Sequence, residues 1–328
     1  MTDLIATTPG LYPLPDWAKD DLSDLKGHQK GDLISGDEGP EIADAYQRAR
    51  SEVVDAQTDA GLDRVVEGQL RWDDMLAHPL TTHENVETGG IVRYYDNNNF
   101  YRDPQVQGEL TPSGDVAAEL DAVDTDALQA VLPGPYSLAD LATDEHYGDE
   151  AAFLDAIATY LADELDGFPS HETLFLLEPS LVENPPEDDV DELASEAIDR
   201  VAAATDADVV VHTYWGAVPE KTYAHLMDAD VDAIGFDFVT DADASLYNIN
   251  EYGTKDQIAM GLVDGQNTLV ESPETIRDRV EWVQDQTQPD FDRAYVTSNT
   301  ELFYLPVNKF EDKLQALGDA AALAEVDA

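Results

Sequence analysis

Short apolar runs alternate along the chain with longer stretches in which apolar residues recur at three- and four-residue steps. Runs bounded by turn residues are typical of buried strands, and the longer spacing is typical of amphipathic helices. The runs lie at residues 4–8, 64–69, 129–134, 173–179, 208–212, 232–237, 258–264 and 294–298. Because the two patterns alternate throughout, we predict one α/β domain over residues 1–328, folded as a (β/α)8 TIM-type barrel.

The alternative architecture is a doubly wound open sheet, which also alternates strands and helices. Its nucleotide-binding versions carry a G-x-G-x-x-G motif or a P-loop after the first strand. The stretch after the first predicted strand reads PGLYPLPDW and contains neither motif. The barrel is therefore the leading prediction.

Residues 89–110 break the regular alternation. They read GGIVRYYDNNNFYRDPQVQGEL, with two aromatic-rich runs on either side of the polar residues 96–99. This pattern predicts a β-hairpin inserted after the second strand. Insertions in that loop lie at the C-terminal face of a barrel, where active sites are built.

The charge of the chain is strongly acidic. The 328 residues include 17 Lys+Arg and 71 Asp+Glu, for a formal net charge of −54. Such an excess excludes sequence-independent binding to nucleic acid and disfavours anionic membranes. The acids are spread along the whole chain, so most are expected on the solvated surface. At molar salt the screening length falls to ~3 Å, and we therefore predict a halophilic protein.

The chain contains no cysteine, which excludes disulfides, thiolate catalysis and sulfur-ligated metals. No apolar run reaches the ~18 residues of a membrane-spanning helix. The first residues, MTDLIATTPG, lack the basic and apolar regions of a secretory signal. We therefore expect a cytoplasmic protein that binds neither membrane nor nucleic acid.

Polar residues at the carboxyl ends of the predicted strands are the candidates for chemistry. His212 ends the fifth strand and Asp237 ends the sixth, so the two should be neighbours. As a pair they could bind a metal or exchange protons. In the alternative, Asp237 accepts the imidazole N–H and only orders the barrel. Glu178, after the fourth strand, is either catalytic or a buried carboxylate that holds loops.

Aromatic and basic residues could bind a substrate at the same face. Ordinary packing is the default for the aromatic residues, but clustered rings could also stack on a planar ligand. They are Trp72, Trp215, Tyr94, Tyr95, Phe100 and Tyr101. Arg93 and Arg102 could hold an anionic substrate tail or form structural ion pairs.

The motifs at the strand ends resemble, in order, those of cobalamin-independent methionine synthase. This zinc enzyme moves a methyl group from a folate to homocysteine. The matching segments are TTPGLYPLP, EGQLRWDDML, PGPYSLADL, LFLLEPSL, VVVHTYWG, MDADVDAIGFDF, GLVDGQNTLVESPETI and AYVTSNTELFYLP. The resemblance implies a single barrel, where the long form of the enzyme has two.

The resemblance also implies an altered zinc site. The four zinc ligands of the family fall on His212, Tyr214, Asp237 and Thr300, so both cysteine positions are lost. One histidine and one aspartate fall short of the three or four protein ligands that zinc usually has. Three family contacts to homocysteine are replaced as well, by Leu11, Gln69 and Leu177.

From strand ends and resemblance together we predict the site residues. The catalytic candidates are His212, Asp237 and Glu178, and the substrate contacts are Tyr12, Gln69, Trp72, Asp74, Asn98, Arg102, Tyr214, Trp215 and Asn299.

The N-terminal barrel of the two-barrel enzymes also lacks zinc and helps to hold the folate. The resemblance therefore implies methyl transfer from methyl-tetrahydrofolate or a methyl-corrinoid, performed together with a zinc-bearing paralogous barrel. The alternatives are a methyltransferase that acts alone on another acceptor and a non-catalytic folate-binding or regulatory barrel. A decarboxylase of the porphyrin type is a further alternative, but the first strand offers no basic residue before Lys19.

Overall fold

Eight parallel strands form the central sheet of the computed structural model, in the order β1-β11-β10-β9-β8-β7-β5-β2. The structure describes residues 2–22, 38–72, 74–93, 95, 100–187, 189–287 and 290–323. The strands are β1 (Asp3–Ala6), β2 (Val65–Val66), β5 (Leu128–Pro133), β7 (Thr173–Leu177), β8 (Asp208–His212), β9 (Ala233–Asp237), β10 (Gln257–Val263) and β11 (Arg293–Ser298). All eight coincide with the apolar runs that predicted them.

The two edge strands of this sheet lie against each other. The backbone N–H groups of Asp63 and Arg64, just before β2, donate to the carbonyl oxygen of Ala6 in β1 at 3.0 and 3.3 Å. Beyond the strands, the N–H of Tyr12 donates to the carbonyl of Gly68 at 2.9 Å. These bonds join the first strand to the second, as closure of the predicted barrel requires.

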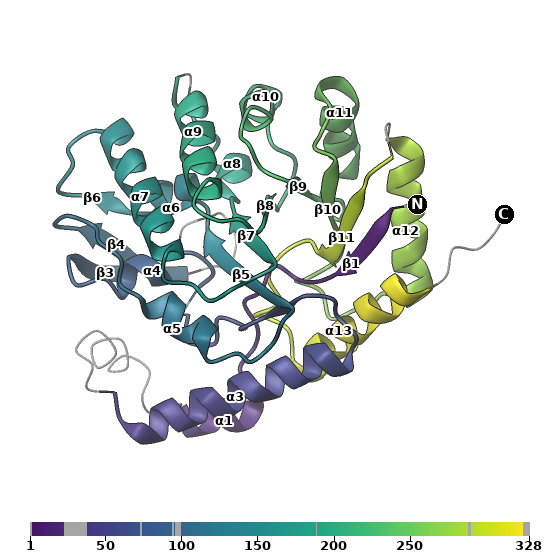
Figure 1. Ribbon diagram of the computed structural model, residues 1–328, viewed down its shortest axis with the longest axis horizontal. Coiled ribbons are helices and arrows are strands. Elements are labelled where there is room, and N and C mark those ends of the chain that lie inside the picture. The colour runs from purple at the N-terminus through teal and green to yellow at the C-terminus, as the bar shows by residue number, and fades with distance from the viewer. Residues whose placement is uncertain are drawn as a thin grey trace.

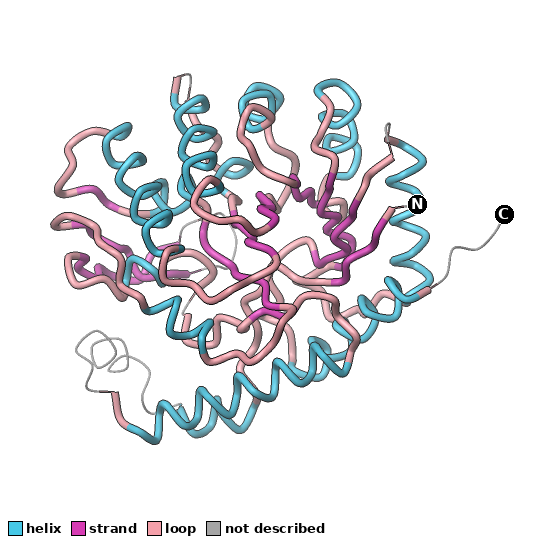
Figure 2. The backbone as a smooth tube through the Cα atoms, in the orientation of Figure 1, coloured by secondary structure: helices cyan, strands magenta, loops and turns pink. Residues whose placement is uncertain are grey.

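Helices surround the strands (Figures 1 and 2). They are α1 (Asp16–Leu22), α3 (Pro40–Asp59), α4 (His78–Thr81), α5 (Asp115–Asp121), α6 (Pro135–Leu141), α7 (Glu150–Leu165), α8 (Ser180–Glu183), α9 (Val190–Ala202), α10 (Glu220–Leu226), α11 (Ala242–Tyr252), α12 (Pro273–Gln286) and α13 (Val307–Ala322). Because helices cover the sheet, every residue of β5, β7 and β9 is buried, as expected of parallel strands. Within the described ranges, no helix combines the length and the apolar character needed to cross a membrane.

The predicted hairpin is present beside the barrel (Figure 1). Strands β3 (Val86–Arg93) and β4 (Phe100–Val106) pair antiparallel, so the insertion begins slightly before residue 89. A short strand, β6 (Thr143–Asp144), extends this sheet by pairing parallel to β4, which the sequence pattern did not predict. Residues 94 and 96–99, including the predicted substrate contact Asn98, lie outside the described residues.

Candidate functional site

Asn299 connects the carboxyl ends of four neighbouring strands. Its side-chain nitrogen donates to both carboxylate oxygens of Asp237 at 3.1 Å, and its side-chain oxygen accepts from the N–H of Gly265 at 2.9 Å. Its backbone N–H donates to Val263 at 2.8 Å, and its carbonyl accepts from Nε2 of His212 at 3.1 Å. Four predicted site strands, β8 to β11, therefore meet at one buried asparagine.

The carboxylate of Asp237 is saturated with hydrogen bonds. Besides Asn299, it accepts from the backbone N–H groups of Trp215, Val239 and Thr240 at 2.8 to 3.0 Å. The hydroxyl of Thr240 adds a bond of 2.7 Å. The side chain is fully buried. These donors occupy the lone pairs of the carboxylate, so the group is satisfied by protein partners.

His212 is a buried, neutral histidine. Its Nε2 donates to a carbonyl, and burial lowers the pKa of the imidazole to about 4. Within the described part of the chain, Nδ1 has no hydrogen-bond partner. The space for the ring exists because Gly235 has no side chain; a Cβ there would lie 2.2 Å from Nδ1.

The expected contact between His212 and Asp237 is therefore wrong in its detail. Both side chains lie at the barrel mouth, meaning the C-terminal ends of the strands, but the imidazole N–H goes to Asn299 and not to the carboxylate. Asn299 stands between the two groups. The alternative in which Asp237 accepts the imidazole N–H is therefore wrong, and a joint role of the two residues in catalysis stays a prediction.

Hydroxyl groups bonded to other protein groups stand at the two positions where the resemblance implies cysteine ligands. The phenol of Tyr214 donates to the sulfur of Met75 at 2.9 Å, and burial raises its pKa well above the ordinary value. The hydroxyl of Thr300 donates to the backbone oxygen of Glu301 at 3.2 Å. Neither is an anionic ligand at neutral pH.

A zinc ion does not fit these residues. In the ranges that the structure describes, no three His, Asp or Glu side chains are grouped so that they could hold a metal. The imidazole Nε2, the carboxylate of Asp237 and both hydroxyl groups are already committed to protein partners. We therefore assign no metal chemistry to this site.

Glu178 caps a helix. Its carboxylate accepts from the N–H groups of Tyr136 and Ser137 at 2.9 and 2.8 Å and from the Ser137 hydroxyl at 2.6 Å. Burial raises the pKa of this carboxyl to about 7, although the hydrogen bonds oppose the rise. Gly134 makes room for it, because a Cβ at that position would lie 2.1 Å from the carboxyl carbon. The geometry matches the loop-holding alternative.

A hydrogen bond joins the segments that follow β1 and β2, and both segments contain residues with unusual backbone conformations. The side-chain oxygen of Gln69 accepts from the N–H of Leu11 at 2.7 Å. Leu11, Gln69 and Trp215 all have positive φ angles, of 51°, 49° and 70°. Non-glycine residues in this region are strained and concentrate at functional sites. Tyr12 is buried beside them, and its hydroxyl bonds Thr8 at 2.5 Å.

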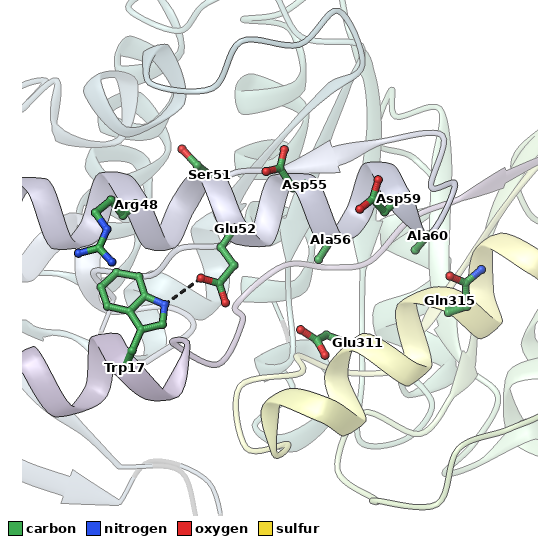
Figure 3. A pocket seen from close by; sticks show the side chains of 10 residues that line it. All are labelled: Trp17, Arg48, Ser51, Glu52, Asp55, Ala56, Asp59, Ala60, Glu311 and Gln315. Atoms are coloured by element: carbon green, nitrogen blue, oxygen red, sulfur yellow. Dashed lines mark hydrogen bonds between the residues drawn. The ribbon is translucent and has the colours of Figure 1, made fainter.

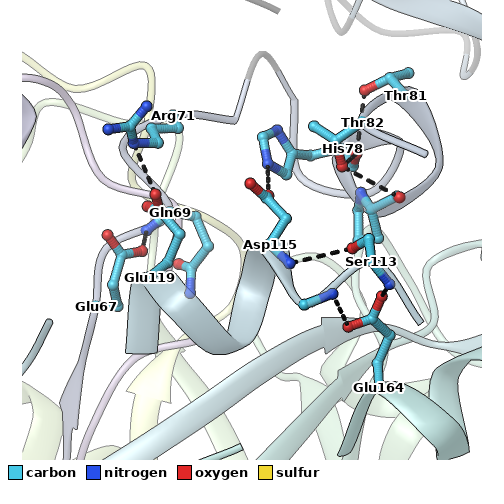
Figure 4. A network of polar contacts seen from close by, with 12 residues as sticks. Glu67, Gln69, Arg71, His78, Thr81, Thr82, Ser113, Asp115, Glu119 and Glu164 are labelled. Carbon is cyan, nitrogen blue, oxygen red and sulfur yellow. Dashed lines mark hydrogen bonds and ion pairs between the residues drawn. The ribbon is translucent and has the colours of Figure 1, made fainter. Parts of the chain in front are cut away.

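A buried ion-pair network supports this corner of the barrel, and the sequence analysis did not predict it. Figure 4 shows three of its residues, Glu67, Arg71 and Glu119. Arg50 binds Glu67 at 2.7 Å and Glu119 at 2.6 Å, and Nε of Arg71 lies 2.7 Å from Glu119. The second oxygen of Glu67 accepts from the N–H of Gln69 at 2.7 Å. The network therefore fixes the strained end of strand two. The scarcity of arginine in so acidic a chain was the available signal.

The remaining predicted substrate contacts follow strand two in the sequence, and two of them make structural contacts within the protein. Trp72 is buried and stacks on His78 with ring centroids 5.2 Å apart. Asp74 accepts from the N–H groups of Leu76 and Ala77 at 2.8 and 2.7 Å. Arg102 lies half-buried in β4. Their roles in substrate binding stay predictions.

An aromatic group joins the hairpin to the barrel mouth. The ring of Tyr95 lies 4.6 Å from that of Trp215, which in turn lies 5.0 Å from Tyr214. The hydroxyl of Tyr95 bonds that of Ser180 at 2.9 Å. This cluster lies where stacking on a planar ligand was predicted.

Glu301 is a candidate that the sequence analysis overlooked. It is 1% exposed, and in the described part of the protein neither carboxylate oxygen has a hydrogen-bond partner. Burial raises the pKa of its carboxyl to about 7. Glu301 directly follows Thr300, where the resemblance implies a zinc ligand, and this neighbourhood was the signal in the sequence.

A separate groove lies on the outside of the barrel, between α1, α3 and α13 (Figure 3). Trp17 donates to Glu52 at 2.8 Å, and the guanidinium of Arg48 lies 4.1 Å from the same indole ring. None of the predicted site residues lines this groove.

Solved structures with the same fold are known. The B12-independent methionine synthase from Shewanella sp. W3-18-1, in complex with selenomethionine, superposes with a TM-score of 0.77 at 18% identity, covering 98% of this chain and 97% of that one. A putative vitamin-B12 independent methionine synthase from Listeria monocytogenes gives 0.69 at 16% identity, covering 98% of each chain.

Proteins related in sequence point to the same family as these structures. The methionine synthase of Sulfolobus acidocaldarius is 24% identical over 323 residues, covering 93% of this chain and 88% of that protein. That of Saccharolobus solfataricus is 23% identical over 299 residues, covering 88% and 85%. The family model described as "Cobalamin-independent synthase, N-terminal domain" matches residues 80–288, well over half of the chain. The protein therefore belongs to the cobalamin-independent methionine synthase family.

Proposed function

We propose that this chain takes part in methyl transfer to homocysteine as a barrel without zinc, together with a zinc-bearing single-barrel partner. The observation that carries the proposal is the state of the four family zinc positions. Their side chains lie at the barrel mouth, yet each is bonded to protein groups or chemically unsuited to zinc. Activation of a thiol needs a group that lowers its pKa, which points to a second protein as the source.

The barrel mouth supports a role in holding the methyl donor. The half-buried ring of Trp215, held in place by the buried rings of Tyr95 and Tyr214, supports stacking on a planar ring system such as a pterin. The donor is methyl-tetrahydrofolate or a methyl-corrinoid. The relatives that bear the name methionine synthase support methyl transfer in general.

The test is reconstitution. The chain is purified in about 2 M KCl, where screening is strong, and assayed for bound zinc and for methionine formation. It is then assayed with a zinc-bearing single-barrel paralogue from the same source. We expect no stoichiometric zinc in this chain, little activity in either protein alone, and activity in the mixture.

Other outcomes assign other functions. Full activity of the paralogue alone would refute the partnership. Stoichiometric metal and turnover by this chain alone would make it an autonomous methyltransferase. Tight folate binding without turnover in any mixture would make it a regulatory barrel.

A further inference from the structure

Glu301 is a buried acid for which the described residues provide no hydrogen-bond partner that meets geometric criteria. Its side chain is 1% exposed, and among the described residues both oxygens lack hydrogen bonds. The backbone N–H of Glu301 and the side chain of Gln266 both lie near the carboxyl group and oppose the rise of its pKa, but neither forms a hydrogen bond of good geometry. A buried polar group without a partner costs stability. Such a group persists in a folded protein when something other than stability requires it.

The other acids at the barrel mouth do not share this state. Asp237 accepts from the backbone, from Thr240 and from Asn299, and Glu178 accepts three hydrogen bonds. Asp74 also accepts two backbone bonds. In the part of the chain that the structure describes, Glu301 is thus the buried acid whose oxygens are both available.

The surroundings of Glu301 bring it close to the aromatic cluster. Burial and, after it, the negative charge of nearby Glu301 raise the pKa of the Tyr214 phenol. Glu301 acts on Tyr304 in the same way. The indole nitrogen of Trp215, next to Tyr214, is likewise buried without a hydrogen-bond partner in the described structure. Among the described residues, unpaired acceptors on Glu301 and an unpaired donor on Trp215 thus follow the ends of two barrel strands, β11 and β8.

We propose that Glu301 is a substrate-binding residue whose two oxygens accept hydrogen bonds from N–H groups of the ligand. The inference rests on the proposed function and deepens it by naming the residue and the chemistry. Two free oxygens on one carboxylate suit either a protonated amine or the paired N–H edge of a heteroaromatic ring. The amino group of an amino acid and the ring edge of a pterin are the two sources of this chemistry.

The test compares Glu301→Gln with a matched buried control, Glu164→Gln. Glu164 is also 1% exposed, but it accepts from the N–H groups of Ser113 and Gly114 away from the barrel mouth (Figure 4). Melting temperature and affinity are measured at pH 7 in about 2 M KCl, with methionine and 5-methyl-tetrahydrofolate as separate probes.

We expect one variant to lose affinity and the other to lose stability. Glu301→Gln should melt no lower than the wild type, because it removes an unpartnered acid, while its affinity for one probe falls about tenfold or more. Glu164→Gln should melt lower and bind both probes unchanged. A loss confined to methionine identifies the amine as the source, and a loss confined to the folate identifies the ring edge.

Two results would overturn the assignment: unchanged affinity of Glu301→Gln for both probes, or no binding of either probe to the wild type. If the probes bind through Glu301 but no mixture with a paralogue makes methionine, the proposed function fails while the binding role of Glu301 stands. The two failures are therefore distinguishable.

Discussion

The side-chain nitrogen of Asn299 lies 3.1 Å from both carboxylate oxygens of Asp237, while the carbonyl of the same asparagine accepts from His212. An amide thus joins two positions at which the family resemblance implies zinc ligands. The bonds hold the strand ends in place without a metal.

Asn299→Asp should destabilise the protein strongly. The substitution keeps the size of the side chain but replaces the donor to Asp237 with a second buried carboxylate. We expect a loss of about 3 kcal/mol in the free energy of unfolding at pH 7, measured by denaturant titration. The loss should shrink at acidic pH as one carboxyl is protonated. Asn250→Asp on exposed α11 is the control and should change stability by less than about 0.5 kcal/mol.

The neutrality of His212 should make the protein sensitive to acid. The folded pKa, about 4, lies below the value near 6.5 of an unfolded histidine. The stabilisation is therefore complete above pH ~6.5 and is lost as the pH falls towards 4, by about 3 kcal/mol.

The measurement is the difference in unfolding free energy between wild type and His212→Gln from pH 7 to 4. Glutamine keeps a donor for Asn299 and does not titrate, so the variant should lose less stability over this range. His146→Gln, at an exposed position, should follow the wild type. An imidazole pKa of 6 or above in the folded protein by NMR would contradict the expectation.

Gly134→Ala should destabilise the helix that Glu178 caps. A Cβ at Gly134 would lie 2.1 Å from the Glu178 carboxyl carbon, so the acid must move away from its three donors. We expect a loss of about 2–3 kcal/mol. Gly39→Ala is a close control, since Gly39 also precedes a proline at the start of a helix, with a similar φ, but has open space around it. It should lose about 1 kcal/mol or less.

Lys313→Met should loosen the loop after β10. The buried ammonium group of Lys313 donates to the carbonyl of Leu269 at 2.6 Å and to Glu271 at 2.7 Å. Removing it leaves Glu271 without this bond, at a cost of about 3 kcal/mol. Lys309→Met on the same helix removes an exposed pair with Asp312 and should cost less than about 1 kcal/mol. Equal melting temperatures of the two variants would contradict the expectation.

Salt should stabilise the protein. A formal charge of −54 gives strong self-repulsion at low ionic strength, and molar salt screens it. We expect the melting temperature to rise markedly between about 0.1 and 2 M KCl. A melting temperature that is flat or falls over this range would refute the proposal of a halophilic protein.

The sequence by itself determined the barrel. Each of its eight strands appeared as a short apolar run, because strands buried on both faces need apolar residues at nearly every position. The hairpin also followed from a local pattern, since aromatic-rich runs lie on either side of the polar residues 96–99 in the sequence. Positions at strand ends, such as His212, Asp237 and Glu178, could likewise be placed, because the carboxyl ends of parallel strands meet at one face.

Only the tertiary structure decided what these side chains do. The bond from Asn299 to Asp237 spans 62 residues of sequence, and the bond from Glu178 to Ser137 spans 41. Glu178 and Glu301 look alike in sequence, since each is an acid near a strand end. Yet Glu178 accepts three hydrogen bonds, whereas the described residues provide none of good geometry to Glu301. The reason is physical: the partner of a buried polar group comes from whichever distant segment folds against it, and no local pattern encodes that meeting.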